Sequence, residues 1–237
     1  MRRRWVKVLA ITVVVLAVLF TVADRVAVHY ADKEVTQLAR EKYDYGNTTD
    51  GHLDVSIEGF PFLTQAFAQD FDDVKLSAGK FTVDTTSNAQ GGYLTVEKLS
   101  LDLQHVHVTS LTARNAEADL ATGSLFLTYD QLSGVLSRLA GTGGPVKVSQ
   151  APGSQGQAAR VEITGPVAGT RVNGTGTFLA QGDEISLTVP GSQQAAASWR
   201  VSLPENVGFT SARSTPDGVE VEMVGHLVNL GASRFVR

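Results

Sequence analysis

From His52 onward, apolar and polar residues alternate with a period of two over most of the chain. Leu53, Val55 and Ile57, for example, are separated by single polar residues. Successive side chains of a β-strand point to opposite faces of a sheet, so this pattern is typical of strands that are buried on one face only. It predicts antiparallel β-structure as the main architecture. Further candidate strands lie at 74–78, 94–103, 125–127, 146–148, 161–163, 171–179, 184–189, 201–203, 207–209 and 219–223.

The alternation changes phase near the middle of the chain. Apolar positions are odd-numbered from Leu99 to Leu103 and even-numbered from Val106 to Val108. A shift of one residue would turn the buried face toward solvent, so we expect a β-bulge or a sharp bend near Gln104–His105.

Two short segments break the period of two and favour helix. Residues 60–67 place Pro61 at a helix start, where its missing N–H costs nothing, and put Phe62, Leu63 and Phe67 on one side. Residues 128–131 read as a capping box that opens a second amphipathic helix, with Tyr129, Leu132 and Leu136 on its apolar face.

The N-terminus carries a basic cluster, Arg2 to Arg4 with Lys7, followed by an apolar run over 8–23. The run is intermediate between a signal-peptide core of about 7–15 residues and a membrane span of about 20. We therefore expect residues 1–24 to be a signal anchor or a cleaved signal peptide. The positive-inside rule sends residues 25–237 across the membrane. The arginines also permit a twin-arginine reading, although a plain basic n-region explains them.

A helix is expected over 24–43, continuous with the membrane segment. Val26, Tyr30, Val35 and Leu38 fall near one side of it, which predicts that this side packs against the strands.

Composition narrows the classes of function. The chain has no cysteine, which removes disulfides, thiolate metal sites and cysteine nucleophiles. Residues 25–237 keep 16 basic and 23 acidic residues, a formal charge of −7. An acidic domain without a basic stripe argues against nucleic acid, and any lipid contact must be mainly apolar. Lys75, Lys80, Lys98 and Arg114 are candidate local contacts to a headgroup.

The fold class that fits is α+β and β-rich: a strongly curved antiparallel sheet wrapped around amphipathic helices, after an N-terminal membrane segment. Many one-sided strands and few helices leave apolar surface that needs a partner. A lipid acyl chain is a natural one.

Three segments resemble the actinobacterial LmeA-like family of phospholipid-binding cell-envelope proteins. They are residues 54–65, which include Gly-Phe-Pro-Phe-Leu-Thr-Gln, residues 127–132, and residues 203–207 with 215–219. The resemblance implies a tubular lipid-binding fold, binding of phospholipids including phosphoinositides, and a place at the outer face of the cytoplasmic membrane. For the two apolar helix faces, core packing and lipid contact are both open readings, and the resemblance favours lipid contact. The candidate groove-lining residues are Phe60, Pro61, Phe62, Leu63, Phe67, Tyr129, Leu132 and Leu136.

These observations favour a non-catalytic protein that binds, and in one version transfers, phospholipid for envelope lipid or lipoglycan biogenesis. The alternative is a non-catalytic adaptor that docks envelope enzymes and has a self-filled core. The sequence has no nucleophile elbow, zinc-protease helix or phosphate-binding glycine loop, so no enzyme, cofactor or metal is expected. His105 and His107 are the nearest approach to a metal pair, and their spacing also arises on any polar strand face.

Overall fold

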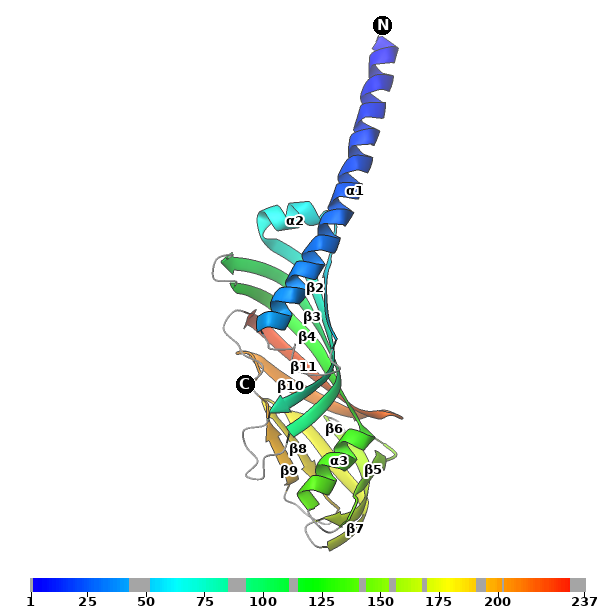
Figure 1. The fold of residues 1–237 in the computed structure, drawn as a ribbon, viewed down its shortest axis with the longest axis vertical. Coiled ribbons are helices and arrows are strands. Elements are labelled where there is room, and N and C mark those ends of the chain that lie inside the picture. The colour runs from blue at the N-terminus through cyan, green and yellow to red at the C-terminus, as the bar shows by residue number, and fades with distance from the viewer. Residues whose placement is uncertain are drawn as a thin grey trace.

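The architecture is β-rich, with two sheets, few helices and one long N-terminal helix (Figure 1). The structure is a computed structural model that describes residues 2–42, 52–84, 93–110, 115–140, 144–153, 157–167, 170–190, 195–201 and 203–230. Within them the helices are α1 (Arg2–Lys42), α2 (Phe62–Ala68) and α3 (Tyr129–Ala140).

The first sheet has six strands in the order β1-β2-β3-β4-β11-β10, and every adjacent pair is antiparallel. Its long central strands are joined by short connections, so local pairing builds most of it. The strands are β1 (Leu53–Glu58), β2 (Asp70–Asp84), β3 (Tyr93–Ser110), β4 (Asn115–Thr128), β10 (Val207–Ser214) and β11 (Gly218–Asn229).

The second sheet has five antiparallel strands in sequence order and follows α3. It meets the first sheet at β10, where Gly182 and Phe209 form an isolated bridge and the Ala212 N–H donates to the Gln157 carbonyl at 2.9 Å. Its strands are β5 (Lys147–Gln150), β6 (Ala158–Val167), β7 (Thr170–Gln181), β8 (Glu184–Thr188) and β9 (Ala195–Arg200).

The expected single, strongly curved sheet wrapped around helices is therefore two open sheets. The five strands that come directly after α3, β5 to β9, pair with one another and not with β4, so the chain starts a new sheet there and returns to the first sheet only with β10 and β11. Side chains of both sheets and of α3 then share one core, which covers apolar strand faces that the sequence had left without a partner. The large core lies here, and its fully buried members include Phe178, Trp199, Leu127 and Leu132.

The predicted bend near Gln104–His105 is confirmed and extends across four strands. At this level one residue on each strand has no partner in the strand register: Asp72, His105, Asp119 and Leu227. His105 and Leu227 both have φ near 51°. A second bend skips Lys80, whose φ is 43°. Each bend shifts the alternation by one residue, so apolar side chains stay on the same side of the sheet along its length.

The predicted capping box at the start of α3 is also confirmed. The Thr128 hydroxyl accepts a hydrogen bond from the Gln131 N–H at 3.2 Å, and the Gln131 side chain accepts one from the Thr128 N–H at 2.9 Å. These reciprocal bonds satisfy two donors that the first turn leaves unpaired.

The helix predicted over 24–43 exists, as the continuous second half of α1, but the face expected to pack is the wrong one. Val26 and Tyr30 are 51% and 66% exposed. The side that lies against the sheet instead carries mostly small and polar residues, among them the buried Asp24 and the half-buried Ala27 and Ala31. The physical reason is that α1 packs along a strand edge, which presents polar backbone groups.

We predict that Leu132→Ala lowers the free energy of unfolding by about 2–5 kcal/mol, because it opens a cavity in a completely buried part of α3. Denaturant unfolding of the full chain, followed by Trp199 fluorescence in a Trp5→Phe background, measures the change. The matched control is Leu227→Ala, at a 60% exposed position, which should change stability by less than about 0.5 kcal/mol. Equal losses in the two variants would contradict this assignment of the core.

Candidate functional site

A strip of partly exposed apolar side chains crosses the middle of β2 and β3. Val74, Leu76, Leu99 and Leu101 are half-buried there. The strand register puts them on the same face, because Leu76 is opposite Leu101 and the neighbouring rows pair Val74 with Leu103 and Ala78 with Leu99. We call these four residues the apolar strip.

The same face is buried on both sides of the strip. Toward β1, the rows continue into Leu53, Val55 and Ile57, which are at most 8% exposed. Toward β4 and β11 they continue into Leu125 and Val221, which belong to the large core under the second sheet. The strip is therefore the part of this apolar face that neither α1 nor the second sheet covers completely.

The β1 side of the strip is held by a ladder of hydrogen bonds between α1 and the free edge of β1. Asp32 accepts from the Ile57 N–H at 2.8 Å, and Thr36 accepts from the Val55 N–H at 3.1 Å. The Arg40 guanidinium donates to the Leu53 carbonyl at 3.0 Å.

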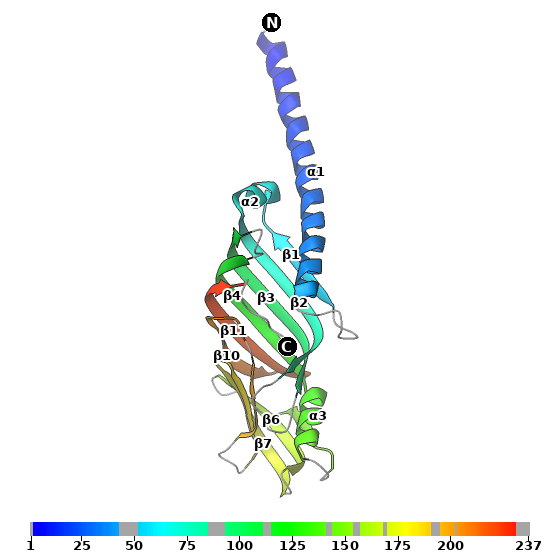
Figure 2. The ribbon, with the colours of Figure 1, turned by 60° about the vertical axis from the view of Figure 1, so that its left-hand side comes forward.

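The spacing of this ladder follows from the geometry of the two elements. Four helical residues rise about 6 Å, and two strand residues rise about 6.6 Å. Each turn of α1 therefore meets the next residue of β1 whose backbone N–H and C=O face the open edge of the sheet. The two elements run in opposite directions. Figure 2 shows α1 lying along the β1 edge of the sheet. The ladder satisfies the edge groups that would otherwise pair with another chain.

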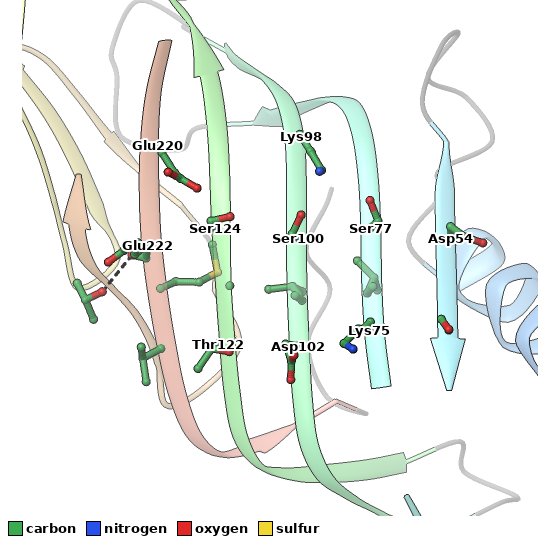
Figure 3. A pocket seen from close by; sticks show the side chains of 17 residues that line it. Asp54, Lys75, Ser77, Lys98, Ser100, Asp102, Thr122, Ser124, Glu220 and Glu222 are labelled. Carbon is green, nitrogen blue, oxygen red and sulfur yellow. Dashed lines mark hydrogen bonds between the residues drawn. The ribbon is translucent and has the colours of Figure 1, made fainter. Parts of the chain in front are cut away.

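The opposite face of the same sheet carries mostly polar and charged side chains and forms a broad, open groove of about 700 Å³ (Figure 3). Atoms of Leu76, Leu101 and Met223 also line it. Hydroxyl groups from Ser77, Ser100 and Ser124 lie in one row across three strands. Acidic side chains outnumber basic ones among the labelled residues, so the charge of the groove favours cationic groups over anionic ones. Its labelled lining residues are Asp54, Lys75, Ser77, Lys98, Ser100, Asp102, Thr122, Ser124, Glu220 and Glu222.

Two of the candidate headgroup cations, Lys75 and Lys98, line the polar groove, and none of those that the structure describes is placed at the apolar strip. Lys75 lies 3.4 Å from Asp73 and 4.0 Å from Glu58, and its hydrogen bond and ion pair with Asp73 raise the pKa of its ammonium group. Lys80 pairs with Glu97 at 3.8 Å. Lys98 projects into the polar groove, and Arg114 lies outside the described residues. The described cations therefore form no cluster beside the apolar strip.

The predicted residues around α2 divide between two sides of that helix. Phe62 is 7% exposed and its ring lies 6.1 Å from that of Phe71. Phe60, Leu63 and Phe67 point outward and are 52%, 36% and 93% exposed. Pro61, at the N-cap, is half-buried. Sequence reasoning placed Phe62 and Phe67 together, but the side chain that shares the inner side with Phe62 is Gln65, which accepts from the Asp72 N–H at 2.8 Å.

The predicted residues of α3 lie at the other end of the molecule (Figure 1). Leu132 and Leu136 are at most 1% exposed and belong to the large core. Tyr129 is 9% exposed and its hydroxyl donates to the Thr215 carbonyl at 2.7 Å. Burial raises the pKa of this phenol. The α3 residues therefore pack in the large core, and they do not lie together with the α2 residues in one groove.

The histidine pair is separated by the bend at His105. His107 faces Asp70 instead, with Nδ1 3.2 Å from the carboxylate. Among the described residues, no group of three or more His, Cys, Asp or Glu side chains is arranged to hold a metal ion.

Sequence reasoning did not single out the α1 ladder or the apolar strip. The ladder does have a signal, because Asp32, Thr36 and Arg40 recur every four residues on one helix face. The strip has none of its own: its leucines and valine follow the same alternation as buried strand residues, and only the coverage of the neighbouring rows sets them apart.

Comparison with known proteins adds one finding. A model of the family described as LmeA-like phospholipid-binding matches residues 22–223, which is most of the chain. No curated protein and no solved structure matches the chain.

We predict that Asp32→Ala speeds hydrogen exchange at the Ile57 amide, because that N–H loses its acceptor at an otherwise buried edge. Leaving such a donor unpaired costs about 1–3 kcal/mol. Hydrogen exchange of the peptide covering 53–58 measures the effect in the full chain. The control is Glu34→Ala, two residues away on an exposed position of α1. If both variants exchange at the parent rate, the ladder does not hold β1.

Proposed function

The chain belongs to the LmeA-like phospholipid-binding family, and on that basis we propose that it binds phospholipid acyl chains without catalysis on the apolar strip of β2 and β3. The observation that supports this site is the partial exposure of Val74, Leu76, Leu99 and Leu101 on a face that is otherwise buried. In this proposal the chain serves cell-envelope lipid or lipoglycan biogenesis.

The energetics require no strong headgroup site. Burial of each methylene contributes roughly 0.8 kcal/mol, so an acyl chain of about 16 carbons contributes on the order of 10 kcal/mol before ordering costs. Lys75 and Lys80 are already ion-paired with carboxylates. Selection of a particular headgroup, phosphoinositide included, is therefore the lesser contribution to binding.

Helix α1 supports a location at the outer face of the cytoplasmic membrane. By length and composition, Thr12–Leu38 contains a stretch that is apolar enough to cross a membrane, and that stretch is almost entirely exposed. With Arg2 to Arg4 and Lys7 retained in the cytoplasm, α1 anchors the sheets at the outer face of the cytoplasmic membrane. The strip then lies close to the lipids that it binds.

One observation favours the adaptor as the second candidate function. Side chains from both sheets and from α3 fill the large core, among them Phe178 and Trp199, both fully buried, so the strand faces around it need no ligand. An adaptor would present the polar groove or the exposed helices to an envelope enzyme.

We predict that a phosphatidylcholine with a photoreactive acyl chain, in nanodiscs that carry the full chain, labels the segments 71–76 and 99–103. Mapping of the adducts by peptide mass spectrometry tests this. Leu76→Asn should reduce labelling of both segments several-fold, because it places an amide on the strip.

The matched control is Ser77→Asn, the same substitution on the next residue, which lines the polar face. It should leave the labelling unchanged. Adducts confined to the apolar half of α1 would show ordinary contact with the bilayer, and the adaptor would become the better account.

A further inference from the structure

Helix α2 and the residue just before its N-cap carry an exposed apolar surface. Leu63 and Phe67 of the helix and Phe60 in front of it form this surface, with exposed fractions of 36%, 93% and 52%. We call these three residues the outward triplet. Large apolar side chains that gather on a surface in this way mark a contact with a partner or a membrane.

The position of α2 along α1 is fixed by a buried contact. Asp24 is completely buried, and its Oδ1 accepts a hydrogen bond from the Leu63 N–H at 2.8 Å. Leu63 lies in the first turn of α2, where N–H groups have no partner within the helix and a carboxylate is favoured. This bond ties the start of α2 to the level of residue 24 on α1.

Residue 24 is also where the apolar run of α1 ends. About 20 residues of helix span the roughly 30 Å hydrocarbon core of a bilayer. The residues that precede Asp24 extend to the basic cluster at Arg2 to Arg4 over about that length. A bilayer crossed by this segment therefore has its outer boundary close to Asp24, and so close to α2.

The orientation of α2 suits that boundary. Figures 1 and 2 show α2 at the end of the six-stranded sheet from which the N-terminal half of α1 projects, and in both views it lies across α1. A helix across the spanning helix lies along the membrane surface. The inner side of α2 is engaged by Phe62 and Gln65, which leaves the outward triplet for lipid.

The local charge is compatible with lipid as well. The seven residues of α2 include no charged side chain, and the nearest acidic residues in the chain, Glu58 and Asp70, flank the helix. Arg25 lies with its guanidinium 5.2 Å from the centre of the Phe60 ring. An arginine stacked on an aromatic ring one residue beyond the apolar run is placed to meet lipid phosphates.

We propose that the outward triplet of α2 docks on the outer surface of the bilayer that α1 crosses, so that the domain sits on the membrane at a fixed height. This rests on the anchoring role of α1 given above and adds a second, interfacial contact to it. The partner is the lipid surface itself. Docking would bring the apolar strip to a constant distance from the lipids.

The absence of cysteine makes the test clean, because a single introduced thiol is the only one in the chain. Phe67→Cys in the full chain, labelled with an environment-sensitive fluorophore and placed in nanodiscs, reports on the surroundings of α2. We expect blue-shifted emission and quenching by nitroxide-bearing lipids several-fold greater than at Thr177→Cys. Thr177 is an exposed residue of β7, and β7 lies at the end of the molecule away from α2 (Figure 1).

Two results would overturn the proposal. Emission typical of water at both positions would mean that α2 stays off the membrane. Blue-shifted emission at position 67 without quenching by the lipid nitroxide would place Phe67 against a second copy or another protein.

Photolabelling of the strip in the same Phe67→Cys protein separates this inference from the proposed function. Labelled strip residues with a water-exposed fluorophore would leave lipid binding intact and reject membrane docking. A quenched fluorophore with an unlabelled strip would support membrane docking and reject lipid binding on the strip.

Discussion

The match in spacing between one turn of α1 and two residues of β1 is the constraint on which the rest of the arrangement depends. It lets Asp32, Thr36 and Arg40 satisfy the free edge of β1 with three hydrogen bonds. The same face of α1 continues two turns earlier to Asp24, which holds the start of α2. One helix therefore closes the sheet edge, bounds the apolar strip and continues into the segment that is apolar enough to cross a membrane. Polar residues make these hydrogen bonds, so most of the large apolar residues of α1 remain on its surface.

Local sequence patterns predicted those elements of the fold that depend mainly on residues close together in the chain. The alternation around Leu53 located β1, the reciprocal pair Thr128 and Gln131 located the start of α3, and the change of phase at His105 located a bend. The second sheet was not predicted, because the alternation of apolar and polar residues in a strand does not indicate which other strand it pairs with. The packing side of α1 was predicted wrongly for a related reason: apolar periodicity assumes an apolar partner, whereas a strand edge offers backbone donors and acceptors.

The candidate site was predicted less well than the fold. The aromatic segment at α2 was recognised, but Phe62 and Phe67 have opposite fates, with 7% and 93% exposure. The α3 residues became core because the second sheet closes over them, which no residue of α3 indicates. The strip could be recognised only from the structure. Leu76 and Leu101 follow the same alternation in the sequence as the buried Leu125, and they differ from it only in how completely other parts of the protein cover them. Lipid sites of this kind depend on incomplete burial, and burial is set by tertiary structure.

The central claim is that the full chain holds a phospholipid as a ligand, apart from the lipids that surround α1. Native mass spectrometry of the full chain, released from detergent micelles at increasing collision energy, tests it most directly. The account predicts one adduct of phospholipid mass that survives after detergent and loosely bound lipid have been removed. A chain that reaches its bare mass at the same energy as the detergent leaves, even after incubation with phospholipid vesicles, would contradict it.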